Sequence, residues 1–244
     1  MWIMKKYLSV FMLIARCSIY KVFGLLILMA GCEFLAFSYG LSSADGGLNG
    51  LENAFEAGFC EYIFVTSCVV LLLLLSRMGA SKSSKTIYTL NRLSVSEKCV
   101  FWIESLYDTL CIIILWLSQA LLSIGLCYYY ILIAGSESTA EQTMFLAFFR
   151  SDFLLSLLPF DEPFLLISNY LLALSLGIST ARLAWADRND KPSNAIMSFA
   201  YIGYNFFFRE VGSLWQSVII CIISAMVIVE AIYFTFKKEA EDEN

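Results

Sequence analysis

The residues best placed to do chemistry in this chain are a few ionisable side chains within long apolar stretches. Glu33, Arg182 and Glu230 stand inside or at the end of such stretches, where a charge is costly and is by default a functional candidate. Glu33 has no basic residue at its depth except Arg209, so it is a candidate to line a substrate path or to carry a proton. Arg182 and Glu230 fall at a similar depth, which allows an ion pair; solvation of both at the membrane surface is the alternative.

Other kinds of chemistry lack their residues. The chain has no histidine, which removes the commonest general base and metal ligand. None of its eight cysteines forms a C-x-x-C pair, so the spacing of zinc and thiol-redox sites is missing. It has no G-x-x-x-x-G-K-[ST] phosphate loop. We therefore expect no enzyme activity, no cofactor or metal in this chain, and no nucleic-acid partner.

The composition is that of a membrane protein. Of 244 residues, 59% are hydrophobic and 15% are charged, whereas a soluble domain has about 25% charged residues. The apolar residues gather in runs near the length of about 20 residues that a helix needs to cross a bilayer. We predict an all-α polytopic membrane protein that forms a single transmembrane domain over residues 1–244. Its six predicted spans are residues 21–41, 59–76, 110–133, 164–181, 195–208 and 217–236.

Two of these spans have distinctive surroundings. The apolar run at 195–208 has 14 residues, or about 21 Å of helix, so it is the weakest of the six predicted spans.

Before the first span, residues 3–20 place Lys5, Ser9 and Arg16 on one helical face, which predicts an interfacial helix along the membrane. The glycine-rich and polar stretch from residue 42 onward predicts turns and mobility in the first outer loop.

The second outer segment contains another amphipathic helix. Residues 143–159 are apolar enough to enter lipid, but Arg150 and Asp152 lie in the middle of the run. A charge at the bilayer centre costs about 2.5–3.5 kcal/mol. We therefore predict an outer-surface or re-entrant helix that Pro159 ends; a seventh span, which would invert everything downstream, is the alternative.

The basic residues set the orientation. Cytoplasmic segments of membrane proteins carry an excess of Lys and Arg. With both termini cytoplasmic, only Arg150 and Arg209 of the 16 basic residues lie in predicted outer segments, which leaves 14 inside. This skew supports the six-span topology and predicts a multi-pass protein of the bacterial cell membrane.

A basic, polar island at residues 81–108 separates two long hydrophobic runs. Residues 86–93 can form a short helix with one apolar face. Ser94 and Glu97 then fit the capping-box pattern, which predicts that a new helix begins there. That helix has no strong breaker before Gly125 and can continue to residue 133, nearly 40 residues in all. Because this exceeds the bilayer, we expect its first turns to lie below the membrane.

A short transverse helix joined to a protruding span helix would let a soluble partner push or pull on the spans. An ordinary basic inner loop that serves only topology is the alternative. The residues we expect to couple a partner ATPase to the spans are Lys85, Tyr88, Leu90, Arg92, Leu93 and Glu97.

The run from Tyr88 to Lys98 resembles the second inner loop of small six-span ABC transporter permeases from Firmicutes. Residues 147–159 are similar to an outer segment of those proteins. The resemblance implies a type-2 exporter-like permease with a coupling helix between spans two and three. The chain departs from that class by placing its elaborate outer segment between spans three and four.

The resemblance also implies the partners and the function. A cytoplasmic ATPase subunit would bind the ATP and Mg²⁺, and a second permease copy or a related chain would complete the pathway in the lipid bilayer. The expected function is export of a peptide, a lipid or a drug-like substrate. Two alternatives remain open: a membrane-bound regulatory or immunity protein without transport, and a proton-coupled carrier that uses Glu33.

Overall fold

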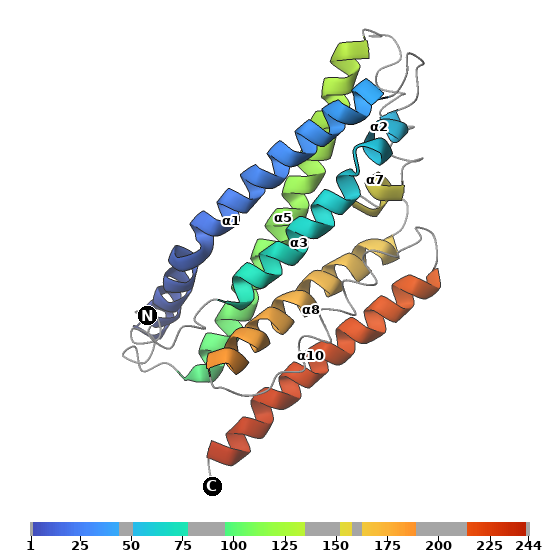
Figure 1. Cartoon of the computed structure of the whole chain (residues 1–244). Coiled ribbons are helices and arrows are strands. Elements are labelled where there is room, and N and C mark those ends of the chain that lie inside the picture. Colours follow the sequence, from blue (N-terminus) through green and yellow to red (C-terminus); the bar gives the residue numbers. More distant parts are fainter. Residues whose placement is uncertain are drawn as a thin grey trace.

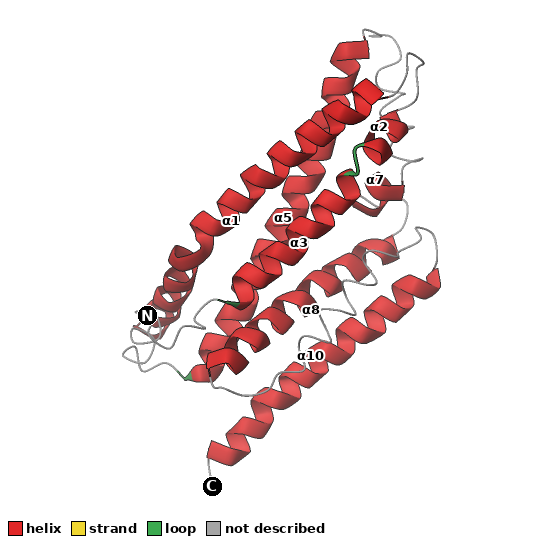
Figure 2. Ribbon diagram, in the orientation of Figure 1, coloured by secondary structure: helices red, strands yellow, loops and turns green. Residues whose placement is uncertain are grey.

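The structure is a computed structural model, and it is all-helical over the residues that it describes (Figure 1, Figure 2). Those residues are 2–43, 51–77, 96–134, 152–157, 163–188 and 214–242. The fold class predicted from composition is therefore confirmed at this coarse level. The helices are α1 (Trp2–Ser43), α2 (Leu51–Ala57), α3 (Cys60–Ser76), α5 (Glu97–Ala134), α7 (Asp152–Leu157), α8 (Pro163–Arg188) and α10 (Leu214–Asp242).

Three helices are long and apolar enough to cross a membrane. The qualifying segments are Tyr7–Ser42 in α1, Glu97–Ile133 in α5 and Phe164–Arg188 in α8. Two shorter apolar helices accompany them, at Cys60–Ser76 and Ser217–Tyr233. These lengths and compositions are those of a membrane protein.

The bundle carries apolar side chains outside and polar side chains inside. Leu35 and Leu121 are 70% and 71% exposed, whereas Asp108 and Ser175 are fully buried. Single exposed leucines also occur in water-soluble proteins, but here exposed large apolar side chains recur along α1, α5, α8 and α10. Exposed apolar faces around a polar interior are what lipid surroundings favour, because lipid solvates the leucines while helices satisfy one another's polar groups.

The long helices run in two directions. Ser18 lies against Tyr107 and Glu33 lies against Gln119, so α1 and α5 are parallel. Helices α3, α8 and α10 run the opposite way (Figure 1). Both termini therefore lie at the end of the bundle where α5 begins.

Three clusters of buried apolar residues hold the helices together. The largest lies where α1, α3, α5 and α8 meet, and its fully buried members include Met29, Leu71 and Leu115. A second cluster joins α2 and α7 to the far ends of α1 and α5. The third packs the beginning of α5 and the end of α8 against α10; its buried members are Phe101, Ile178, Ala181, Trp185, Ala186 and Ala231.

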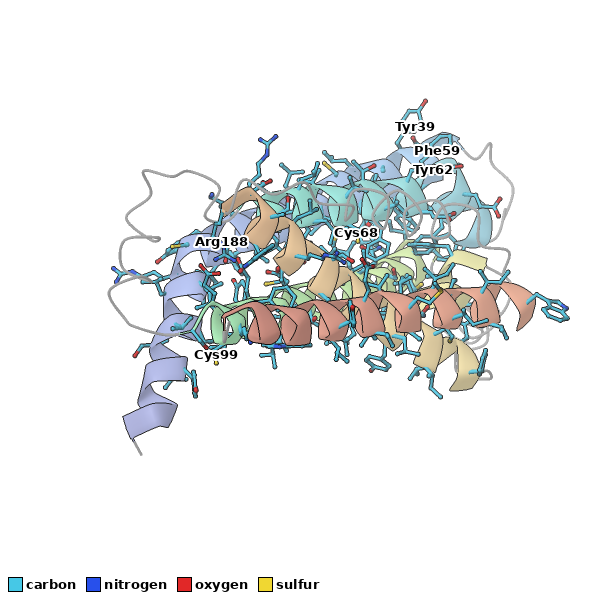
Figure 3. All side chains as sticks on the ribbon, turned by 90° about the horizontal axis from the view of Figure 1, so that it is seen from below. Tyr39, Phe59, Tyr62, Cys68, Cys99 and Arg188 are labelled. Carbon is cyan, nitrogen blue, oxygen red and sulfur yellow. The ribbon has the colours of Figure 1, made fainter. Side chains whose placement is uncertain are left out.

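The structure has no separate interfacial helix at residues 3–20. Residues 2–43 form one continuous helix, α1, which changes direction near its N-terminal end (Figure 3). No proline occurs in this stretch to stop the helix. Val10 and Ile14 are buried in the largest core cluster, so the apolar residues in this part of α1 pack against the bundle. The predicted boundary between residues 3–20 and span 21–41 therefore falls inside one continuous helix. That residues 3–20 lie along a membrane stays a prediction.

The other helix boundaries follow the sequence predictions to different degrees. Helix α3 matches the predicted span 59–76, and α5 has the long continuous form predicted, with 38 residues. Helices α8 and α10 extend beyond the predicted spans 164–181 and 217–236.

The first outer loop contains more structure than its glycines suggested. Helix α2 lies in the stretch where we predicted turns and mobility. It packs closely on α1: a Cβ atom on Gly40 would lie 2.6 Å from the Ala54 carbonyl oxygen. Phe59 then takes a left-handed backbone conformation, with φ 51°, and redirects the chain into α3.

Three predicted elements lie outside the described residues, wholly or in part. They are the short coupling helix at 86–93, the fifth span at 195–208, and the first half of the outer helix at 143–159. Helix α7 is the described part of that outer helix.

Candidate functional site

One face of α5 carries a line of buried polar side chains along the bundle. Glu104, Asp108, Gln119 and Ser123 are each at most 3% exposed. Their spacings of four residues place Glu104 beside Asp108, and Gln119 beside Ser123, on the same helical face. They fall into two groups, which we call the inner cluster and the central cluster.

The inner cluster comprises Glu104, Asp108, Thr180 and Arg188. Arg188 Nη2 donates a hydrogen bond to Glu104 Oε2 and forms an ion pair with it. The side chains of Arg188 and Glu104 are 15% and 3% exposed, and Figure 3 shows Arg188 near the end of the bundle that contains Cys99. This pair joins the first turns of α5 to the last turn of α8.

Asp108 lies one turn further along α5 and is fully buried. Neither of its carboxyl oxygens has a hydrogen-bond partner among the described residues. The nearby Thr180 hydroxyl donates instead to the carbonyl oxygens of Leu176 and Gly177, at 3.1 and 2.8 Å. The carboxyl groups of Glu104 and Asp108 therefore both lie near the guanidinium group of Arg188, and Glu104 already forms an ion pair with it.

A glycine brings α8 close enough to α5 for these contacts. A Cβ atom on Gly177 would lie 2.7 Å from the backbone nitrogen of Thr109 and 2.9 Å from its Cα. Only glycine fits at that separation. Small residues permit such close helix packing in membrane proteins, and here they place Thr180 beside Asp108.

Helix α1 holds the same end of α5 from another side. The hydroxyl groups of Ser18 and Tyr107 are 2.6 Å apart, at hydrogen-bond distance. The Phe11 ring packs edge-on to the Tyr107 ring, with centroids 5.6 Å apart. The first turns of α5 are therefore fixed between α1 and α8.

The central cluster comprises Glu33, Gln119 and Ser123. Gln119 Nε2 donates to Glu33 Oε2 at 2.8 Å, which links α5 to α1. Polar side chains within apolar helices commonly hydrogen-bond across to a neighbouring helix, and Gln119 does so here. Glu33 Oε1, Gln119 Oε1 and Ser123 Oγ have no hydrogen-bond partner among the described residues.

The remaining intramembrane candidates lie on α8 and α10. Arg182 Nη1 is 2.8 Å from Glu230 Oε1, so the two side chains form an ion pair. Their side chains are 22% and 53% exposed, far more than those of the Glu104–Arg188 pair. Ser175 and Ser224 join the same two helices further along, with 3.4 Å between their hydroxyl oxygens.

Of the predicted coupling residues, the structure describes Glu97 alone. It begins α5 and is exposed. Lys85, Tyr88, Leu90, Arg92 and Leu93 lie outside the described residues, as does Ser94 of the capping box. That these residues form one coupling surface stays a prediction.

Glu104 and Asp108 belong to the first turns of α5, which we expected to lie below the membrane, and the structure buries both within the bundle. The signal that would have found them is their spacing. They share a helical face with Tyr107 and Cys111, and a run of apolar neighbours around two acids indicates a packed face.

The chemistry of these clusters is that of proton or cation binding and of ion pairing. No group of three or more Cys, Asp or Glu side chains in the described part of the chain could hold a metal ion. No family model, curated protein or solved structure matches this chain.

Proposed function

We propose that this chain is the transmembrane permease subunit of an ABC transporter, an exporter powered by a separate ATPase subunit. The observation that carries the proposal is the fixing of α5 at its beginning. The basic, polar island at residues 81–108 includes the first turns of α5, which Tyr107 holds against α1 and Glu104 holds against Arg188 of α8. A displacement of the island would therefore be transmitted to two other helices.

Helix directions support six spans. Helices α8 and α10 are parallel, because Ser175 pairs with Ser224 and, further along both, Arg182 pairs with Glu230. The chain leaves α8 at one end of the bundle and enters α10 at the other (Figure 1). We infer that the chain crosses once more between them, and residues 195–208 have the apolar run for such a crossing.

In the proposed mechanism, the ATPase binds the island through Lys85, Tyr88, Leu90, Arg92, Leu93 and Glu97. ATP and Mg²⁺ bind the ATPase, whose closure moves the island. The rigid connection at Glu104 and Arg188 makes α5 and α8 move together, and a second permease copy or a related chain completes the pathway. The substrate class is a peptide, a lipid or a drug-like molecule.

Copurification from native membranes tests this proposal. The tagged chain should bring down a protein with ATPase activity, and Lys85→Glu combined with Arg92→Glu should remove it. Lys237→Glu combined with Lys238→Glu is the matched control, because it reverses two basic residues of the C-terminal segment. If no ATPase copurifies, or if the control removes it as effectively as the island variant, the proposal is wrong.

A further inference from the structure

The central cluster contains more buried oxygen atoms than its internal hydrogen bond satisfies. Glu33 and Gln119 are fully buried and Ser123 is 1% exposed. Within the described residues, one oxygen atom of each side chain has no partner: Glu33 Oε1, Gln119 Oε1 and Ser123 Oγ. An unpaired buried polar atom loses its hydration without compensation, so a ligand that engages all three would be stabilised.

These three oxygen atoms belong to neighbouring side chains. Gln119 bonds directly to Glu33 at 2.8 Å, and Ser123 follows Gln119 by one turn on the same face of α5. Together they offer a carboxylate, an amide carbonyl and a hydroxyl oxygen. Hard cations prefer oxygen ligands of this kind.

The charge of the cluster determines the valence of the ligand. Glu33 is its single carboxyl group, so one positive charge makes the cluster neutral. A divalent ion would leave a net charge in an apolar interior, which is costly. A proton on Glu33 also gives neutrality, but its hydrogen can be donated to one oxygen only. A metal cation, by contrast, can be bound by several oxygen ligands at once.

We propose that Glu33, Gln119 and Ser123 form a binding site for a monovalent metal cation of the sodium class. The site lies between α1 and α5. A bound cation strengthens the connection between α1 and α5. The site stands independently of the ATPase, because it involves none of the island residues.

Thermal unfolding of the full-length chain in lipid nanodiscs tests the site. Sodium chloride replaces choline chloride at constant ionic strength, with lithium and potassium as further arms. The unfolding midpoint should rise with the logarithm of the sodium concentration once the site saturates, because a ligand of the folded state stabilises it. Glu33→Gln should abolish this rise, because the amide keeps the shape and removes the charge.

The serines on α5 supply a matched pair of variants. Ser123→Ala should weaken sodium affinity about 10- to 100-fold, as loss of a group in a metal site typically does. Ser118→Ala should leave the affinity unchanged, because the Ser118 hydroxyl already donates to the Leu115 carbonyl oxygen at 2.7 Å.

Three outcomes would overturn the proposal. The first is equal midpoints in sodium and choline. The second is an undiminished sodium response in Glu33→Gln or, if that variant does not fold, in Ser123→Ala. The third is a midpoint that follows pH but not sodium, which would assign a proton to Glu33.

Discussion

Two carboxyl groups and one guanidinium group define the inner cluster at the scale of single residues. Arg188 engages Glu104, while Asp108 beside them is buried and has no hydrogen-bond partner in the part of the chain that the structure describes. A buried ion pair need not stabilise a protein relative to apolar residues, but removal of one partner strands the other charge. The consequence of breaking this pair should therefore exceed that of breaking an exposed one.

Arg188→Met should lower the free energy of unfolding by about 3 kcal/mol, the lower end of the range for breaking a buried pair. The variant leaves Glu104 next to Asp108 with no compensating charge. Its unfolding can be measured in detergent by heat or by denaturant. The double variant Arg188→Met with Glu104→Gln should recover most of the loss, because it removes the stranded charge as well.

Arg182→Met is the matched control for that measurement. It breaks an arginine–glutamate pair on the same helix, but Glu230 is 53% exposed. Exposed pairs contribute about 0–1 kcal/mol, so this variant should unfold almost as the wild type does. If Arg182→Met and Arg188→Met lowered the free energy of unfolding equally, the Glu104–Arg188 pair would contribute no more than an exposed pair, and the prediction would be wrong.

At the scale of elements, the close approach of α5 and α8 depends on Gly177. Gly177→Ala should destabilise the protein by about 1–3 kcal/mol, the usual cost of overpacking, because the new Cβ meets the backbone of Thr109 at 2.7 Å. Unfolding measurements report the stability of the variant, and crosslinking between α5 and α8 reports the separation of the two helices. Gly125→Ala is the control: nothing lies within 4 Å of its Cβ position, so it should be neutral or stabilising. A neutral Gly177→Ala would contradict the close approach.

Helix α5 shows what the sequence makes predictable and what it does not. Its length followed from the absence of a strong breaker between Glu97 and Gly125. The burial of Glu104 and Asp108 did not follow, because it depends on Arg188, which is 84 residues beyond Glu104. Local pattern fixes where a helix can run, whereas its surroundings depend on long-range packing.

Helix α1 gives the same lesson. Its basic residues and apolar faces suit a helix that lies on a membrane, and they suit equally a helix that packs on α5. The buried Val10 and Ile14 decide for packing. The sequence marks Glu33 and Gln119 individually, because each is a polar residue within an apolar run. It does not show that they pair, because the pairing depends on the parallel arrangement of α1 and α5.

At the scale of the whole molecule, the helix directions and the basic residues make one consistent topology. The beginnings of α1 and α5 and the ends of α3, α8 and α10 share one end of the bundle (Figure 1). Most of the basic residues belong to segments at or next to that end. From the positive-inside tendency we predict that this end is cytoplasmic and that α2 lies at the outer surface.

Two single-cysteine additions test that orientation. Glu56→Cys, at an exposed position of α2, should react with a membrane-impermeant maleimide added to intact cells, because α2 lies at the end opposite the termini. Ser96→Cys, exposed just before α5, should react only after permeabilisation. The wild-type chain, with its eight native cysteines, gives the background labelling. The reverse pattern would place the termini and the basic island outside the cell, where no cytoplasmic ATPase could reach Lys85 or Arg92. Equal reaction of both variants in intact cells would rule out a membrane between the two ends of the bundle.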